Sequence, residues 1–218
     1  MYTLYWSADS GAFAIQVLLE ELGAPYRREI VDTARGEQRA PEYLAINPMA
    51  QVPALRLPDG TVITETGAML MHLCDTHPGH GLLPVPGTAQ RAVANRWLFW
   101  LATGLYESDL RYYYAERYTA DAAGAAGVKA AALARMDRLL AMAEDLLGEG
   151  PFALGAEFSA VDLYLFMLSL WHPARFEVLD RHPKLAALLR AVRRRPAVDR
   201  IWADNHPPAE SAWSTWTG

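Results

Sequence analysis

Three short segments near the start of the chain carry side chains that can bind and activate a charged small molecule. The first is residues 4–11, where a predicted strand runs into a turn and a helix begins near Ser10. A hydroxyl at that place lies beside unpaired helical amides and the positive end of the helix dipole, which suits an anion such as a thiolate. The alternative is that Ser10 only caps the helix. For Ser7, at the strand end, a structural role is favoured more strongly than for Ser10.

The second segment is residues 47–55, in which Pro53 stands at the entrance to a predicted strand. Proline is tolerated there because the strand ladder loses no donor. If the peptide bond before Pro53 is cis, the main chain of Val52 is turned outward. It can then pair with a peptide-like ligand as an added strand would. The alternative is an ordinary edge-strand proline.

The third segment, residues 64–70, brings the carboxylate of Glu65 and the hydroxyl of Thr66 to the start of a predicted helix. Amides at a helix start bind a carboxylate, and Glu65 binds an ammonium group, so the pair fits both charges of an α-amino-acid end. A good helix cap at Thr66 and a favourable charge at Glu65 explain the same residues about equally well.

The elements that must position these segments form an α/β pattern over residues 1–80. We predict strands at residues 2–6, 26–31, 52–57 and 62–64, and helices at 13–22, 37–46 and 68–75. The order is β-α-β-α-β-β-α. Its first βαβ unit predicts a parallel strand pair with a right-handed crossover, and a hairpin around Pro58-Asp59-Gly60 adds an antiparallel edge.

Strand signals stop after residues 77–87, a stretch with three prolines and three glycines that is typical of a linker. We expect a first domain at residues 1–79, a linker at 80–87 and an all-helical domain at 88–218. The predicted helices of this all-helical domain are 88–118, 128–147, 159–171, 183–195 and 196–203.

Ser159 and Asp162 form a carboxylate variant of the capping box at the start of the third helix of this domain. The tail from Asn205 is assigned to no element.

Composition narrows the classes of function. The chain has 218 residues, 52% hydrophobic and 21% charged, with a net charge of −5, which argues against a nucleic acid or an anionic membrane as partner. The one cysteine, Cys74, allows neither an internal disulfide nor a multi-cysteine metal site, and we expect no metal and a buried, inert thiol. No signal-peptide pattern and no membrane-spanning stretch is visible, so we expect the cytoplasm.

Taken together and in this order, the motifs resemble those of bacterial cytosolic glutathione transferases. The resemblance rests on residues 51–55, the pairs 59–60 and 65–66, the end of the first helix at 19–26, and residues 158–162. It extends over nearly the whole chain, to about Ala203. It implies an α/β plus all-α fold, with a thioredoxin-like glutathione-binding domain followed by an all-helical domain.

The resemblance also implies roles for single residues. Pro53 is expected to be cis, and the main chain of Val52 to bind the cysteinyl part of glutathione. Glu65 and Thr66 would hold the γ-glutamyl end. The glycine end would be contacted at Gln51 and by Arg35 or Gln38, in the loop before the second helix. Ser10 is the expected activating residue, as in serine-type classes, with Tyr5 as the fallback and Gly11 roughly where a cysteine-type class has its nucleophile.

A second, apolar substrate is expected between the domains. We expect Tyr106, Asp109, Tyr113 and Trp171 to line that pocket, because an aromatic cleft with a few hydroxyls suits an apolar electrophile. The alternative is that these aromatic residues belong to the helical core or to a dimer surface.

The predicted protein is a homodimeric detoxification enzyme that joins the thiolate of glutathione to a hydrophobic electrophile. The alternatives are a glutathione-dependent disulfide or peroxide reductase, and a non-enzymatic carrier of glutathione or hydrophobic molecules.

Overall fold

The computed structural model describes residues 1–205, and the rest of the unassigned tail, from residue 206 onward, lies outside the described residues. The described residues form two compact units. One comprises residues 1–81 together with those from Arg193 onward, and the other comprises residues 82–192. The domain boundaries given above, at residues 79 and 88, stay a prediction. Within residues 1–205, no helix is both long and apolar enough to cross a membrane.

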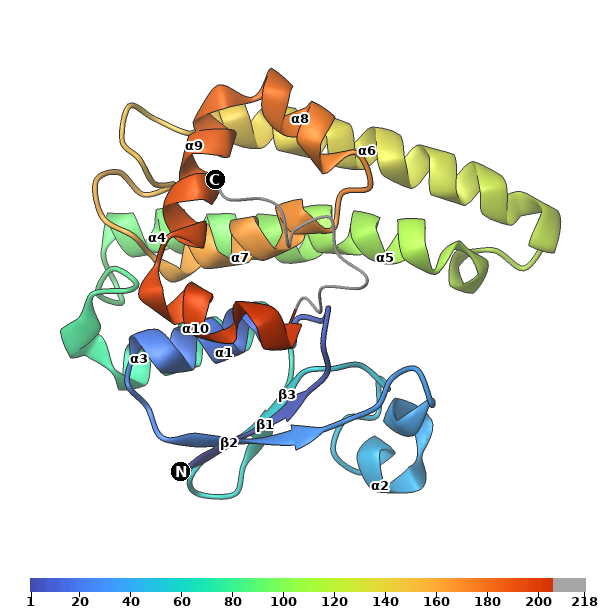
Figure 1. Cartoon of the computed structure of the whole chain (residues 1–218), viewed down its shortest axis with the longest axis horizontal. Helices are drawn as coiled ribbons and strands as arrows, with labels where there is room; N and C mark the ends of the chain where they lie inside the picture. Colours follow the sequence, from blue (N-terminus) through green and yellow to red (C-terminus); the bar gives the residue numbers. More distant parts are fainter. Residues whose placement is uncertain (206–218) are drawn as a thin grey trace. The chain divides into compact units, whose positions relative to one another are not determined.

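The first unit is built on a four-stranded sheet in the order β2-β1-β3-β4 (Figure 1). The strands are β1 (Tyr2–Trp6), β2 (Tyr26–Ile30), β3 (Ala54–Arg56) and β4 (Val62–Ile63). β1 runs parallel to β2, and β3 runs antiparallel to both β1 and β4, so the predicted parallel pair and hairpin are confirmed. All five residues of β1 are buried, as expected for an inner strand that is covered on both faces.

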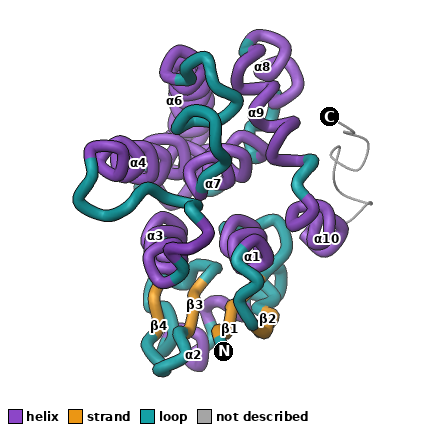
Figure 2. The backbone as a smooth tube through the Cα atoms, turned by 90° about the vertical axis from the view of Figure 1, so that its left-hand side faces the viewer, coloured by secondary structure: helices purple, strands orange, loops and turns teal. Residues whose placement is uncertain are grey.

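Four helices belong to this unit: α1 (Ala12–Glu21), α2 (Pro41–Leu44), α3 (Thr66–Thr76) and α10 (Pro196–Asn205). Figures 1 and 2 show α1 and α3 on one side of the sheet, α2 on the other side, and α10 beside α1. A 3-10 turn, η1 (Glu37–Arg39), precedes α2, so the irregular helix predicted at residues 37–46 is two short pieces. A second one, η2 (Pro78–His80), follows α3.

The second unit is entirely helical in its regular elements. They are α4 (Ala89–Trp100), η3 (Leu101–Tyr106), α5 (Glu107–Tyr113), η4 (Ala115–Tyr118), η5 (Ala122–Gly124), α6 (Ala125–Leu146), α7 (Ala160–Leu170), α8 (Arg175–Arg181) and α9 (Pro183–Arg193). The single helix predicted at residues 88–118 is interrupted, because η3 is a π-helical stretch with Gly104 inside it. Glycine weakens an α-helix locally, and π-turns recur at functional sites.

Helix α7 is the centre of the second unit, with every one of its residues buried. The predicted capping box is confirmed at its start. One oxygen of Asp162 accepts hydrogen bonds from the main-chain N and the Oγ of Ser159, at 2.7 and 2.8 Å, and the other accepts from the N of Ala153 at 2.6 Å. Burial outweighs these bonds and raises the pKa of Asp162 to about 6.

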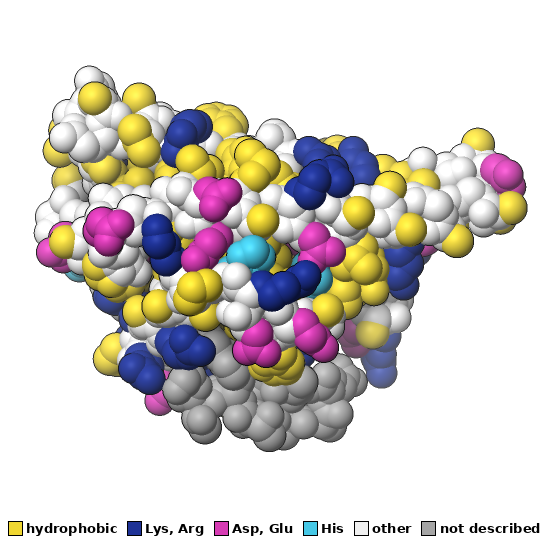
Figure 3. Space-filling view, turned by 90° about the horizontal axis from the view of Figure 1, so that it is seen from above, with side chains coloured by type: hydrophobic (Ala, Val, Ile, Leu, Met, Phe, Trp, Pro, Cys, Tyr) yellow, Lys and Arg dark blue, Asp and Glu magenta, His cyan; other side chains and the backbone are white. Residues whose placement is uncertain are grey.

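Helices α6, α8 and α9 are joined by polar contacts within the second unit. Glu144 of α6 accepts from the main-chain N of Lys184 at 3.1 Å and of Leu185 at 2.8 Å, which provides acceptors for the free amides at the start of α9. Arg181 of α8 pairs with Asp137 of α6 at 3.4 Å. Figure 3 shows basic and acidic side chains interspersed on the face that it draws.

Candidate functional site

The sheet register brings the three candidate segments to one edge of the first unit. It pairs Tyr5 of β1 with Ala54 of β3, and Leu55 of β3 with Ile63 of β4. Because β3 runs opposite to its two neighbours, the end of β1, the start of β3 and the end of β4 meet at the same edge. That edge carries residues 7–11, 51–53 and 65–66.

Ser10 lies at the positive end of α1, as expected. The helix begins at Ala12, and the Ser10 Oγ accepts a hydrogen bond from the Ala12 N at 3.2 Å. The same Oγ donates to the main-chain oxygen of Ser7 at 2.7 Å. The hydroxyl therefore serves the turn in this structure, and it must rotate away from Ser7 before it can donate to a bound sulfur.

The two other candidate hydroxyls are more buried than that of Ser10. The Ser7 Oγ lies 3.1 Å from the Thr33 Oγ1. The hydroxyl of Tyr5 accepts from Arg56 Nε at 3.2 Å and from Arg56 Nη2 at 2.8 Å. Because the hydroxyls of Ser7 and Tyr5 are buried and already hydrogen-bonded, the hydroxyl of Ser10 is the best placed of the three to contact a ligand.

The main chain next to Pro53 is free at this edge. The Val52–Pro53 peptide bond is cis, as the resemblance implied. The preceding carbonyl, of Gln51, accepts from the Tyr43 hydroxyl at 2.7 Å and from the Asn47 Nδ2 at 2.8 Å, which fixes the loop. Within residues 1–205, the main chain of Val52 itself makes no hydrogen bond, so its N–H and C=O are available to a ligand.

Glu65 combines an unusual backbone with an unpaired carboxylate. Its φ and ψ are 66° and 111°, a region that is sparsely populated for residues with a Cβ. Its side chain is exposed, and the carboxylate has no hydrogen-bond or ion-pair partner among residues 1–205. Thr66, which follows, is buried at the start of α3. Such backbone positions cost about 1–3 kcal/mol and cluster at binding sites.

The loop with the two candidates for the glycine end is tied to the same edge through the Ser7–Thr33 contact. The guanidinium of Arg35 is exposed and lies 3.5 Å from the carboxylate of Asp32. Gln38 donates weakly to the Thr33 oxygen at 3.4 Å, and its buried Oε1 has no partner in the part of the chain that the structure describes. Of the two, Gln38 offers the unsatisfied polar atom.

The four residues expected to meet a second substrate come together within the second unit. Tyr106, Asp109 and Tyr113 are three and four positions apart and share one helical face. The ring of Tyr106 lies 5.5 Å from that of Trp171, and the Tyr113 hydroxyl donates to the Trp171 oxygen at 2.5 Å. Burial raises the pKa of Tyr113 to about 12.

Asp109 is the chemically unusual member of this group. Its side chain is 1% exposed, and neither carboxyl oxygen has a hydrogen-bond partner within residues 1–205. Burial raises the pKa of Asp109 well above its usual value, because the charged form loses its hydration. The group therefore favours the neutral, proton-donating form over a wider range of pH than an exposed aspartate does.

No group of three or more His, Cys, Asp or Glu side chains among residues 1–205 is arranged to hold a metal ion. Cys74 is buried, as expected, and forms no disulfide.

A mixed four-stranded sheet unit with flanking helices and a unit of helices is the architecture of the two-domain, glutathione-dependent transferases. Residues 12–76 match the family model of the glutathione S-transferase N-terminal domain, and residues 108–202 match that of the C-terminal domain. The chain belongs to the glutathione S-transferase family. It is a glutathione transferase, with glutathione as its co-substrate.

Individual relatives agree with this assignment. A glutathione transferase homologue from Sulfitobacter, solved with bound glutathione, is 32% identical, has a TM-score of 0.87, and the match covers 94% of this chain and 98% of that one. Glutathione S-transferase GstA of Escherichia coli O157:H7 is 27% identical, over 89% of this chain and 94% of its own. The transcriptional regulator URE2 of Saccharomyces cerevisiae is 34% identical, but the match covers 71% of this chain and about half of URE2, 49%.

Two features of the site region were missed by the sequence analysis. Arg56 binds the Tyr5 hydroxyl, which nothing in the spacing of the two residues indicates. Asn205, in the unassigned tail, bonds to Gln16 of α1. The signal for the second contact was a polar residue, Gln16, inside the apolar run 13–19, since a buried amide requires a partner.

Proposed function

We propose that the edge of the first unit holds glutathione in an extended form. The main chain of Val52 pairs with the cysteinyl part, as an added strand would. The Glu65 carboxylate binds the ammonium of the γ-glutamyl end, and the first amides of α3, beginning at Thr66, bind its carboxylate. Gln51 and Gln38, or Arg35, contact the glycine end. The observation that carries the proposal is that the free main chain of Val52 and the unpaired Glu65 carboxylate lie at the edge that holds Ser10.

Ser10 activates the sulfur in this proposal. A free thiol has a pKa of about 8.5, so only a few per cent is thiolate at neutral pH. A hydrogen bond from the Ser10 hydroxyl and the positive end of α1 both favour the charged form. Full ionisation raises the reactive fraction by about thirtyfold at most. The rest of the rate must come from holding the electrophile beside the sulfur.

The reaction is a displacement or an addition at an electrophilic carbon. In both cases the sulfur of the thiolate forms a bond to that carbon. In a displacement the leaving group departs with its electron pair, and in an addition the electron pair of the attacked double bond moves to the neighbouring atom, which takes a proton from water. The aromatic face of the second unit, made by Tyr106, Tyr113 and Trp171 with Asp109, contacts the apolar part of the electrophile. We place this activity in a cytoplasmic homodimer that detoxifies small electrophiles, on the strength of the family resemblance and the charge and cysteine content of the chain.

The test is glutathione binding to Glu65→Gln, measured by titration calorimetry on the full chain. A charge-assisted hydrogen bond contributes roughly 1.5–3 kcal/mol, so the variant should bind about ten- to a hundredfold more weakly. Glu42→Gln, an exposed glutamate of α2, is the matched control and should bind as the wild type does. Equal affinity of all three proteins would contradict the proposed site.

The reaction itself is tested with an aryl halide and a small disulfide as parallel substrates. The proposal predicts that glutathione is joined to the aryl halide, and that this rate far exceeds reduction of the disulfide. Activity with the disulfide and none with the aryl halide would favour the reductase alternative. Binding without either activity would favour a carrier.

A further inference from the structure

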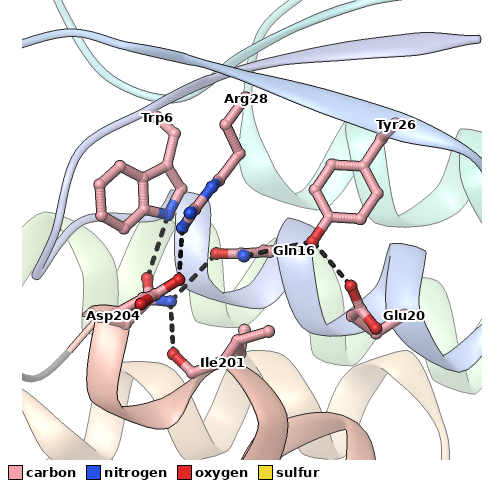
Figure 4. A network of polar contacts seen from close by, with 8 residues as sticks. Trp6, Gln16, Glu20, Tyr26, Arg28, Ile201 and Asp204 are labelled. Carbon is pink, nitrogen blue, oxygen red and sulfur yellow. Dashed lines mark hydrogen bonds and ion pairs between the residues drawn. The ribbon is translucent and has the colours of Figure 1, made fainter.

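The last residue of α10, Asn205, joins three separate parts of the first unit. Its side chain is fully buried. Its Nδ2 donates to the Gln16 Oε1 of α1 and to the Ile201 oxygen, both at 3.0 Å. Its Oδ1 accepts from the Trp6 Nε1 at 3.2 Å, and its main-chain oxygen accepts from the Asp9 N at 3.3 Å. Figure 4 shows Trp6 and Gln16 turned toward the end of α10.

The partners require an amide at this position. The indole of Trp6 can only donate, so it needs an oxygen, and the carbonyl of Ile201 can only accept, so it needs an N–H. A carboxylate would place oxygen against the Ile201 carbonyl, and an alanine would leave the Trp6 N–H without its acceptor. The chain of bonds continues from the Gln16 Nε2 to the Tyr26 hydroxyl at 3.2 Å and from that hydroxyl to Glu20 at 2.8 Å, which fixes the orientation of Gln16 (Figure 4).

These contacts surround the turn that carries Ser10. Trp6 is the last residue of β1, Asp9 directly precedes Ser10, and Gln16 lies one turn into α1. Asp9 has a φ of 49°, in the left-handed region that residues other than glycine rarely occupy. A backbone in this conformation persists only where its surroundings hold it, and the hydrogen bond from its N–H to Asn205 is one of the contacts that do so.

From this geometry we infer that Asn205 is a positioning residue for Ser10: it sets the path of residues 7–10 and thereby the direction of the Ser10 hydroxyl. The inference rests on the proposed role of Ser10 as the activating residue. Asn205 acts on the sulfur only through Ser10 and touches neither the Val52 main chain nor Glu65. Its loss should therefore change the ionisation of bound glutathione more than its affinity.

Ion pairs outside Asn205 also hold α10 against the first unit. The positioning role of Asn205 can therefore be separated from a purely structural role in holding α10. Arg195 binds Glu21 of α1 through two contacts of 2.6 and 2.8 Å. Arg28 of β2 pairs with Asp204 at 2.9 Å. Asp204→Asn is the matched control, because it changes the neighbouring residue of the same helix and loses an ion pair without touching the turn at residues 7–10.

The experiment measures the pKa of glutathione bound to the full chain, by ultraviolet difference spectra across pH, together with the dissociation constant of glutathione and the midpoint of thermal unfolding. Asn205→Ala should raise the pKa of the bound thiol toward its free value of about 8.5 while the dissociation constant changes less than about threefold. Asp204→Asn should keep the wild-type pKa. If Asn205→Ala folds poorly, Trp6→Phe removes the indole donor while keeping an aromatic ring at that position, and it should shift the pKa in the same direction.

A double-mutant cycle separates this inference from the proposed function. If Asn205 acts through Ser10, then Asn205→Ala should add no further shift in the pKa of bound glutathione to that of Ser10→Ala. A wild-type pKa in Asn205→Ala, with only a lower unfolding midpoint, would overturn the inference and leave the role of Ser10 intact. A wild-type pKa in Ser10→Ala would instead overturn the activating role itself, and the inference with it.

Discussion

The hydroxyl of Ser10 donates its hydrogen bond within its own turn, to the main-chain oxygen of Ser7 at 2.7 Å. Two magnitudes decide whether it can turn to a ligand. A neutral hydrogen bond contributes about 1 kcal/mol net, and a bond to an ionised group is roughly twice as strong. Rotation toward a thiolate is therefore favourable, while rotation toward a neutral thiol is not. The site should thus select the charged form of glutathione, which is the form that reacts.

The fallback residue, Tyr5, gives a contrasting prediction. Its hydroxyl is buried and already accepts two bonds from Arg56. Tyr5→Phe should cost about 1 kcal/mol of unfolding free energy, because Arg56 is partly exposed and can turn to water. Its rate of glutathione conjugation should stay within about twofold of the wild type, since the Tyr5 hydroxyl is held by Arg56 and is not the group proposed to bind the sulfur. Steady-state kinetics and urea unfolding measure both, and loss of the thiolate in this variant would transfer the activating role to Tyr5.

Local motifs led to the cis peptide bond before Pro53 and to the position of Glu65 just before α3, both of which the structure has. The partners of other side chains in the site region could not be predicted. Arg56 and Tyr5 are 51 positions apart, and Asn205 and Trp6 are 199 apart. No periodicity or spacing encodes such contacts, because they depend on how the strands and α10 pack after folding. The most that the sequence offers is an unmatched polar residue in an apolar helix, such as Gln16.

At the scale of elements, α7 depends on the carboxylate of Asp162 at its start. Asp162→Ala would leave the main-chain N of Ala153 and of Ser159 without their acceptor. Loss of a helix cap costs about 0.5–2 kcal/mol and each unsatisfied buried donor about 1–3 kcal/mol, so we expect a loss of about 3 kcal/mol of unfolding free energy. Urea unfolding measures this change. Asp145→Ala, at an exposed position of α6, is the control, and equal stability of the two variants would contradict this account.

Strands and the capped helix were predictable because each depends on its own few residues. The long helix at 88–118 was predicted without its π-helical interruption, since an apolar stripe shows a buried face but not a widened turn. Helix α8 was not predicted at all. Its seven residues are too few for a helical period to be recognised. The packing of α10 on α1 could not be predicted from the sequence either, because an amphipathic pattern shows that a helix has an apolar face but not which surface that face packs against.

At the scale of the whole molecule, the buried carboxyl of Asp109 should make stability depend on pH. Its pKa is raised in the folded state, so between the unfolded and folded values the folded chain keeps a proton that the unfolded chain releases. Stability from this group is full below the unfolded pKa and is lost as pH rises through the folded one. Each unit by which the pKa is raised corresponds to about 1.4 kcal/mol.

Asp109→Asn removes this titration. Its free energy of unfolding, measured by urea denaturation from pH 4 to 8, should fall less with rising pH than that of the wild type. Asp145→Asn, at an exposed aspartate of α6, should follow the wild-type curve. Parallel curves for wild type and Asp109→Asn would show that the Asp109 carboxyl is not neutral in the folded chain.

The central claim, that Ser10 turns bound glutathione into a thiolate, is tested most directly by the ultraviolet difference spectrum of glutathione bound to the full chain across pH. Wild type, Ser10→Ala and Ser7→Ala would be compared. The account predicts a thiolate signal near neutral pH in wild type and Ser7→Ala, and its loss in Ser10→Ala, whose bound thiol should ionise near its free pKa of about 8.5. Binding of glutathione by the wild type without a thiolate signal, or an unchanged signal in Ser10→Ala, would contradict it.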